Sequence, residues 1–148
     1  MIAHALKYSG VRQVGLELGR RLGYLLREER ICADLLVPVP LHKRKIRERG
    51  FNQSYLIARG IAEVLGIPVR TDIVHRCKWT QSQTALSKDE RKQNVANAFR
   101  GGRAGVSELR ILVVDDVITT GATVEAVGAA LKRSGAKYVI AVSAALAE

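Results

Sequence analysis

The sequence has 148 residues, of which 47% are hydrophobic and 26% are charged, and its formal net charge is +10. This length and apolar content suit one domain, spanning residues 1–148, with a single sizeable core, and they argue against a disordered chain. No run of about 18 apolar residues occurs, and two isolated cysteines offer no zinc or disulfide framework, so we expect a soluble cytoplasmic protein without a membrane span.

The first 53 residues predict a helix, a strand and a basic loop. Apolar side chains recur at three- and four-residue steps through residues 11–28, as they do in an amphipathic helix. Residues 35–41 form an apolar run with two prolines, which predicts a short buried strand that ends at Pro38 or Pro40. The segment 42–53 begins with a cluster of cations, and we expect it to be a basic loop.

A second helix and a long polar segment follow. Asn52 or Ser54 could cap the helix, and Gly66 ends it. Residues 69–76 predict a second strand. The stretch 78–97 has few apolar side chains, so we expect a long loop with a short helical piece near its end. Long polar loops in compact domains often serve as lids or binding loops.

The C-terminal segment predicts a strand, a helix and a strand. Residues 110–116 form an apolar strand that ends in two acids, and residues 119–123 turn into a helix. Gly135 ends that helix before a buried strand at 138–146. Strands that alternate with helices predict an α/β fold with a mainly parallel central sheet and helices on both faces.

The acids and the turn after the strand at 110–116 indicate a binding site. Asp115 and Asp116 stand at the carboxyl end of the strand, where ligands bind in open α/β sheets. Carboxylates accept hydrogen bonds from sugar hydroxyls. The free N–H groups of a helix N-terminus suit a phosphate, and the turn that leads into it comprises Thr119, Thr120, Gly121, Ala122 and Thr123. The pattern therefore predicts a site for a phosphorylated sugar.

Other motifs with related features do not match. The absence of GxxxxGK[ST] excludes a Walker A loop, and the absence of GxGxxG excludes the Rossmann fingerprint. A response-regulator receiver domain also has a strand that ends in paired acids. Several strand–helix units follow the acids there, whereas only 32 residues follow Asp116 here.

The positive charge is concentrated ahead of the acids. The first 110 residues carry a balance of +11, and residues 111–148 carry a balance of −1. Such an excess favours nucleic acid or a small molecule rich in phosphate as partner, and a solvated basic surface would have the same composition.

The segment VVDDVITTGAT (113–123) resembles the phosphoribosyl pyrophosphate (PRPP) motif of type I phosphoribosyltransferases. VPVPLHKRKIRERGFNQ (37–53) and TQSQTALSKDERKQNVANAF (80–99) resemble the ComF subgroup of that family, which is associated with DNA uptake in competent bacteria. With LKYSG (6–10), the resemblance covers nearly the whole chain. Many ComF-like proteins carry an N-terminal cysteine-rich zinc-binding segment that this sequence lacks, so no function of that segment is carried over.

The resemblance implies a type I phosphoribosyltransferase-like fold, with a small hood formed by residues 1–30. It assigns the motif at 111–127 to PRPP, with the ribose hydroxyls on Asp115 and Asp116 and the 5′-phosphate on the loop 119–123. This assignment agrees with the chemistry of the residues. Mg²⁺ would be the cofactor, held mainly by pyrophosphate and ribose oxygens with water, and no protein-built metal site is expected.

The resemblance also implies pyrophosphate contacts and a flexible loop. In the basic segment we expect pyrophosphate to meet Arg49 with Gly50, and Lys43 or Arg44, because guanidinium groups bind phosphate oxygens in a forked geometry. A solvated side chain is the alternative for each. The segment 78–97 would close over the reacting centre. The catalytic residues expected are Asp115, Asp116, Lys88 and Arg91.

The function implied is Mg²⁺-dependent transfer of phosphoribosyl from PRPP to an unidentified nitrogen nucleophile, with release of pyrophosphate. The alternative is a non-catalytic competence protein that binds nucleic acid through its basic surface, although only 5% of the residues are aromatic. A regulator that senses PRPP without turnover would use the same site. Expected partners are PRPP or a related phosphorylated ribose, DNA or the competence machinery, and a second copy in a homodimer.

Overall fold

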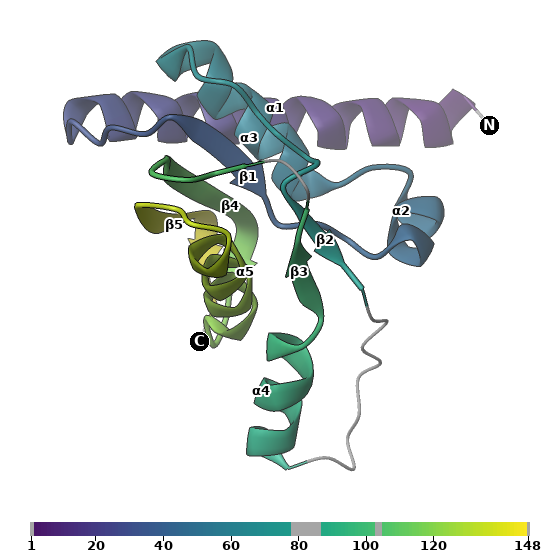
Figure 1. The fold of residues 1–148 in the computed structure, drawn as a ribbon. Helices are drawn as coiled ribbons and strands as arrows, with labels where there is room; N and C mark the ends of the chain where they lie inside the picture. The colour runs from purple at the N-terminus through teal and green to yellow at the C-terminus, as the bar shows by residue number, and fades with distance from the viewer. Residues whose placement is uncertain (1, 78–86, 103–104, 148) are drawn as a thin grey trace.

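The computed structural model describes residues 2–77, 87–102 and 105–147 (Figure 1). None of the helices in these ranges has both the length and the apolar character needed to span a membrane. In chain order, the helices and strands are α1 (Ile2–Glu28), β1 (Leu35–Pro38), α2 (Lys43–Arg49), α3 (Gln53–Leu65), β2 (Val74–Arg76), α4 (Lys88–Ala96), β3 (Phe99–Gly101), β4 (Arg110–Ile118), α5 (Ala122–Arg133) and β5 (Tyr138–Leu146).

A parallel sheet with the strand order β1-β4-β5 forms the centre of the molecule. Leu35 of β1 lies opposite Ile111 of β4, and an isolated bridge from Leu36 to Val69 extends the other edge of β1. The side chains at 111–114 are all buried. Burial of successive side chains is typical of a parallel strand that is covered on both faces.

Helices cover both faces of this sheet (Figure 1). On one face, Val127 of α5 packs against Ile111 together with the hairpin of β2 and β3. On the other face, Ile61 of α3 packs against Leu112, and α1 lies across α3. The predicted α/β fold, mainly parallel with helices on both faces, is confirmed.

The N-terminal helix is closely packed against α3. Gly19 and Gly60 meet where the two helices cross, and a Cβ atom on Gly19 would overlap the backbone oxygen of Ile57. The Arg20 Nε atom lies 2.7 Å from Glu63 Oε2 on the same pair of helices. Because the crossing admits no side chain at Gly19 or Gly60, α1 is held against the domain at a fixed distance.

Residues 42–50, predicted as a basic loop, instead form the helix α2. The His42 Nδ1 atom accepts a hydrogen bond from the Arg44 N–H group at 3.2 Å and caps the helix. Gly50 ends it with a φ of 83°. The prediction was wrong because Lys, Arg and Glu are good helix formers, and a dense positive charge does not prevent one short helix between two caps.

The segment 69–76 is only partly a strand. Val69 makes its single bridge to β1, and an ion pair between Arg70 and Asp72 (2.6 Å) occupies the bend before β2. The partner of β2 is β3, which the sequence pattern did not predict. This antiparallel pairing brings Cys77 and Ala98, which flank the segment 78–97, side by side. The helical piece expected in that segment is α4, and residues 78–86 lie outside the described residues.

Candidate functional site

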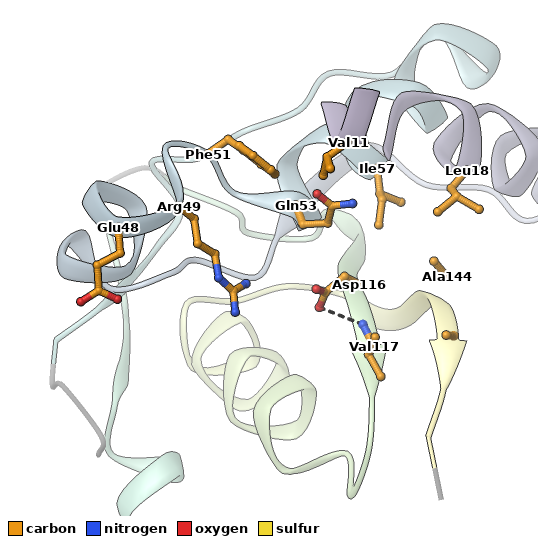
Figure 2. Close-up of a pocket in the computed structure, with 11 residues that line it drawn as sticks. Val11, Leu18, Glu48, Arg49, Phe51, Gln53, Ile57, Asp116, Val117 and Ala144 are labelled. Atoms are coloured by element: carbon orange, nitrogen blue, oxygen red, sulfur yellow. Dashed lines mark hydrogen bonds between the residues drawn. The ribbon is translucent and has the colours of Figure 1, made fainter. Parts of the chain in front are cut away.

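Asp115 and Asp116 lie near the carboxyl end of β4, which continues to Ile118 rather than ending at the acids as predicted, and they line different cavities. Successive side chains of a strand point to opposite faces. Asp115 lines a small cavity of about 30 Å³ formed with residues 117–124. Asp116 lines a cleft of about 620 Å³ that extends towards α1 and the end of β5 (Figure 2). Each of these two cavities therefore has one carboxylate of the acidic pair in its wall.

Hydrogen bonds hold both carboxylates in place. Asp115 Oδ1 accepts hydrogen bonds from the Ser54 hydroxyl at 3.2 Å and from the Asp116 N–H group at 2.9 Å. Asp116 Oδ1 accepts a hydrogen bond from the Val117 N–H group at 2.8 Å. These three hydrogen bonds engage only the Oδ1 atom of each carboxylate, so they leave Oδ2 for a ligand hydroxyl.

The environment of Asp115 raises the pKa of its carboxyl group to about 6. Burial is the largest cause, followed by the side chain and the charge of Asp116. The hydrogen bond from Ser54 acts in the opposite direction and lowers the pKa. A carboxyl group that titrates near neutral pH in a cavity is a common feature of functional sites.

The turn at residues 119–123 forms the small cavity beside Asp115. Gly121 has a φ of 83°, a left-handed conformation that side chains disfavour, and α5 begins at the next residue. The Ala122 N–H group donates to Thr120 Oγ1 at 3.3 Å. The first backbone N–H groups of α5 and the hydroxyls of Thr119, Thr120 and Thr123 thus surround one place where a phosphate oxygen could be bound.

The cations of α2 are divided between two cavities. Arg49 lines the cleft beside Asp116, and Figure 2 shows its guanidinium group extending from the end of α2 towards that space. Lys43, at the start of α2, lines a third cavity of about 590 Å³ beside the end of β1. Arg44 lies 3.6 Å from Glu48 on the exposed surface of the helix. The expected pyrophosphate contacts are therefore not gathered at one place.

Arg76 joins Lys43 in the cavity beside β1 and was missed by the sequence prediction. Its guanidinium group lies 5.2 Å from the centre of the Phe99 ring. Burial lowers the pKa of Arg76, and the negative charge of Asp115 opposes this effect, so the two side chains are close enough to interact electrostatically. A cation that is half-buried beside the acidic pair is a candidate ligand of phosphate.

Ser54 is the second functional candidate that the sequence prediction missed. Asn52 caps α3, as one of the two expected possibilities, by accepting a hydrogen bond from the Ser54 N–H group at 3.1 Å. Ser54 itself is only 4% exposed, and its hydroxyl points to Asp115. The sequence gives no signal for this contact because it joins two elements that are remote in the chain.

Lys88 and Arg91 lie on α4, which begins with a capping box between Ser87 and Glu90. The side chains of Lys88 and Arg91 are outside the described part of the structure, so their predicted role in closure stays a prediction. Gly50 ends α2 next to the cleft-lining residues Arg49 and Phe51.

Comparison with known proteins identifies the family. Residues 52–147 match the family model described as the phosphoribosyl transferase domain. The chain is 36% identical over 148 residues to the DNA utilization protein YhgH of Salmonella typhi, covering 94% of this chain and 63% of that protein. It is 36% identical over 111 residues to Competence protein F of Haemophilus influenzae, covering 72% of this chain and 47% of that protein.

A solved structure with a similar fold is the glutamine PRPP amidotransferase from B. subtilis. It has a TM-score of 0.62 and 25% sequence identity, over 90% of this chain and 26% of that chain. The chain thus spans less than two thirds of the length of each of these proteins. From the domain match and these relatives, the chain belongs to the phosphoribosyl transferase domain family, as a ComF-like member of the type I phosphoribosyltransferases.

Proposed function

We propose that the chain binds PRPP and transfers its phosphoribosyl group to a nitrogen nucleophile, with Mg²⁺ present and pyrophosphate released. The observation that carries the proposal is the position of the acidic pair near the carboxyl end of β4. The turn at 119–123, which suits a phosphate, lies next to Asp115. The cavity beside β1 holds the cations Lys43 and Arg76, whereas the cleft beside Asp116 holds both Asp116 and Arg49. The family membership supports PRPP as the phosphorylated sugar.

The ribose 5-phosphate end of PRPP fits the region from Asp115 to Thr123. The 5′-phosphate would accept hydrogen bonds from the N–H groups at the start of α5 and from the threonine hydroxyls. The ribose hydroxyls would donate to Asp115 and Asp116, whose Oδ1 atoms are already fixed by Ser54 and Val117. Positioning of this kind lowers the barrier because little reorganisation is left for the reaction itself.

The pyrophosphate end fits the cavity beside β1. Lys43 and Arg76 are the cations that line it, and they would stabilise the charge that develops on the leaving pyrophosphate. Arg49 lines the other cavity, so we assign it to the acceptor side of the sugar. Lys88 and Arg91 would add positive charge if the segment 78–97 closes over the leaving group.

Mg²⁺ fits this arrangement as an ion that arrives with the ligand. Within the described residues, no three His, Cys, Asp or Glu side chains gather into a group that could hold a metal ion. Phosphate oxygens, ribose oxygens and water would therefore supply its ligands, as this small, hard ion prefers. Bound in this way, Mg²⁺ would neutralise charge on the pyrophosphate.

A thermal-shift experiment with an isosteric double variant tests the proposal. With PRPP and Mg²⁺ at about 100 times the Kd, the native chain gains roughly 2.7 kcal/mol, which corresponds to a rise in Tm of about 5–10 °C. We expect Asp115→Asn/Asp116→Asn to lose most of this rise while it still melts cooperatively without ligand. An equal rise in the double variant would overturn the site, and no rise in the native chain would overturn the function.

A second candidate function is the handling of DNA, which the names of the curated relatives favour. Those names describe DNA utilization and competence for the relatives themselves. In this chain, α2 carries five cations within seven residues on a largely exposed surface. Contacts to DNA phosphates alone support non-specific binding. The two functions use different parts of α2 and can be tested separately.

A further inference from the structure

The cleft beside Asp116 and the cavity beside β1 are both lined mainly by apolar side chains, and they differ in the charges that they hold. The walls of the cleft include Leu18 of α1, Ile57 of α3 and Ala144 of β5 (Figure 2). Its charged side chains are Asp116, Arg49 and Glu48. Glu48 lies 3.6 Å from Arg44 on the exposed surface of α2, so Arg49 is balanced by Asp116 and the cleft has no excess of positive charge. The cavity beside β1 instead holds Lys43 and Arg76. An anion would therefore be attracted to the cavity beside β1 more strongly than to the cleft.

The two spaces lie on different sides of the acidic pair. The cavity is lined by the ends of β1 and β2, and the cleft by β4, β5 and α1. Residues of α2 and α3 line both spaces. Because β4 lies between β1 and β5, a ribose held on Asp115 and Asp116 has one space on each side. In a substitution at C1 of the sugar, the nucleophile and the leaving group need separate places. The cationic cavity suits pyrophosphate, which leaves the cleft for the nucleophile.

We infer that the cleft beside Asp116 binds the acceptor of the proposed transfer, and that this acceptor is a neutral, flat azole with an apolar body. The inference rests on the proposed function and adds the chemical class of its second substrate. A volume of about 620 Å³ is within the range of small-molecule sites. Burial of a flat apolar ring against such walls is favourable, because it removes apolar surface from water.

The few polar groups of the cleft limit what the acceptor can carry. The amide of Gln53 is the uncharged polar side chain of the lining, and it can read one donor or acceptor at the ring edge. A carboxylated ring would meet Arg49 next to the Asp116 carboxylate, which opposes the attraction of the arginine. A purine with several polar edges would leave some of them without partners in the cleft, which weakens binding. The cleft therefore favours a sparsely substituted ring.

Each bond, electron pair and proton of the proposed transfer can be accounted for by the azole, PRPP and the residues of the site. The pyridine-type nitrogen of the azole forms a bond to C1 with its lone pair, and the bond from C1 to the pyrophosphate oxygen breaks. Pyrophosphate leaves with that electron pair, next to Lys43 and Arg76. The azole loses the proton of its N–H group to the Asp116 carboxylate, which passes it to water. Phe51, whose ring lies 5.5 Å from the guanidinium carbon of Arg12, offers an aromatic wall for the acceptor.

Calorimetric titration with three probes of similar shape tests the inference in the presence of Mg²⁺ and PRPP. The probes are benzimidazole, benzimidazole-5-carboxylate and hypoxanthine. We expect benzimidazole to bind at least tenfold more tightly than the other two. Tighter or equal binding of the carboxylate or of hypoxanthine would overturn the assignment of a neutral, apolar acceptor.

Blocking variants locate the binding to the cleft. Ala144→Leu fills it from β5 and Val11→Trp fills it from α1, so either variant suffices if the other does not fold. Ala141→Leu is the matched control, because Ala141 is an exposed residue of the same strand outside the lining. We expect benzimidazole affinity to fall at least tenfold in the blocking variants and to stay unchanged in the control. Unchanged affinity in both blocking variants would overturn the inference.

The outcome separates this inference from the proposed function. A PRPP-induced rise in Tm without any binding of benzimidazole would overturn the acceptor assignment and leave PRPP binding intact. Binding of benzimidazole without any effect of PRPP would overturn the proposed function, and the acceptor role with it. Release of pyrophosphate that requires benzimidazole, and that Ala144→Leu abolishes, would support both.

Discussion

Asp115 is subject to opposing interactions that set its charge near neutral pH. Burial and the neighbouring Asp116 favour the protonated form, and the Ser54 hydroxyl favours the carboxylate. With a pKa of about 6, the group is mostly ionised at pH 7.5 and can accept hydrogen bonds from ribose hydroxyls. The folded chain therefore holds a carboxylate that is useful to a ligand and costly to the fold.

The substitution Asp115→Asn should stabilise the ligand-free chain at high pH. The pKa of Asp115 is raised from 3.8 to about 6 by folding, so stability is lost as the pH rises through 6. Because the carboxyl group is only partly buried, solvent screening reduces this cost to about 1 kcal/mol. We expect the Tm of the variant to exceed that of the native chain by about 2–4 °C at pH 8 and by progressively less towards pH 4.

Thermal melts between pH 4 and pH 8 without ligand measure this effect. Asp89→Asn removes an exposed carboxylate from the first turn of α4 and should not raise the Tm, because the acid there interacts favourably with the helix dipole. A Tm difference for Asp115→Asn that is absent at pH 8, or that grows as the pH falls, would contradict the raised pKa.

Some residues of the site can be predicted from their spacing within one segment of the sequence, and others cannot. Asp115, Asp116 and the turn at 119–123 lie within one strand–turn–helix unit, so their spacing in the sequence already reports their proximity. Ser54 and Arg76 reach the acids from other elements, and only the packing of α3 and the β2–β3 hairpin brings them there. Such contacts have no signature in a single sequence.

The same distinction holds for the elements. α3, α5 and β5 were predicted because their signals lie within the segment itself. Helical spacing of apolar residues with a residue that ends the helix indicates α3 and α5, and a continuous apolar run indicates β5. β3 was not predicted, because a three-residue strand with one buried side chain has no periodicity. The close packing of α1 on α3 was also not predicted, since a glycine in a helix reads only as a weak helix former.

The crossing of α1 and α3 determines one wall of the cleft. Val11 and Leu18 of α1 line it, and the distance of α1 from the sheet is set by the contact of Gly19 with Gly60. Any side chain added at this crossing would push α1 away from α3. The element that provides the cleft wall is therefore sensitive to a single methyl group.

Gly19→Ala should destabilise the domain even though alanine is the better helix former. The added Cβ would overlap the Ile57 backbone oxygen, and overpacking against a backbone costs about 1–3 kcal/mol. The expected result is a Tm lower by roughly 2–10 °C, measured by thermal or urea unfolding. Gly10→Ala is the control, because no atom lies within 4 Å of a Cβ at that position of α1, and it should raise stability by up to about 1 kcal/mol. Equal effects of the two variants would contradict the close packing.

At the scale of the whole molecule, the excess of positive charge has two separable consequences. Lys43 and Arg49, at the two ends of α2, line the cavity beside β1 and the cleft beside Asp116, respectively. Arg44 and Arg47 lie between them, and neither lines these cavities. Cations that line a small-molecule site act at short range, whereas exposed cations also contribute to the long-range attraction of a polyanion.

Arg44→Gln/Arg47→Gln should therefore weaken DNA binding and spare PRPP binding. The logarithm of DNA affinity falls linearly with the logarithm of salt concentration, and each lost phosphate contact makes that slope shallower by about 0.9. We expect the double variant to reduce the slope by up to about 2 in fluorescence anisotropy with a random duplex, and to keep the Tm rise given by PRPP and Mg²⁺. Arg133→Gln, at the C-terminal end of α5, should leave both measurements nearly unchanged. If the double variant kept the salt slope and lost the PRPP response, α2 would serve the small-molecule site alone.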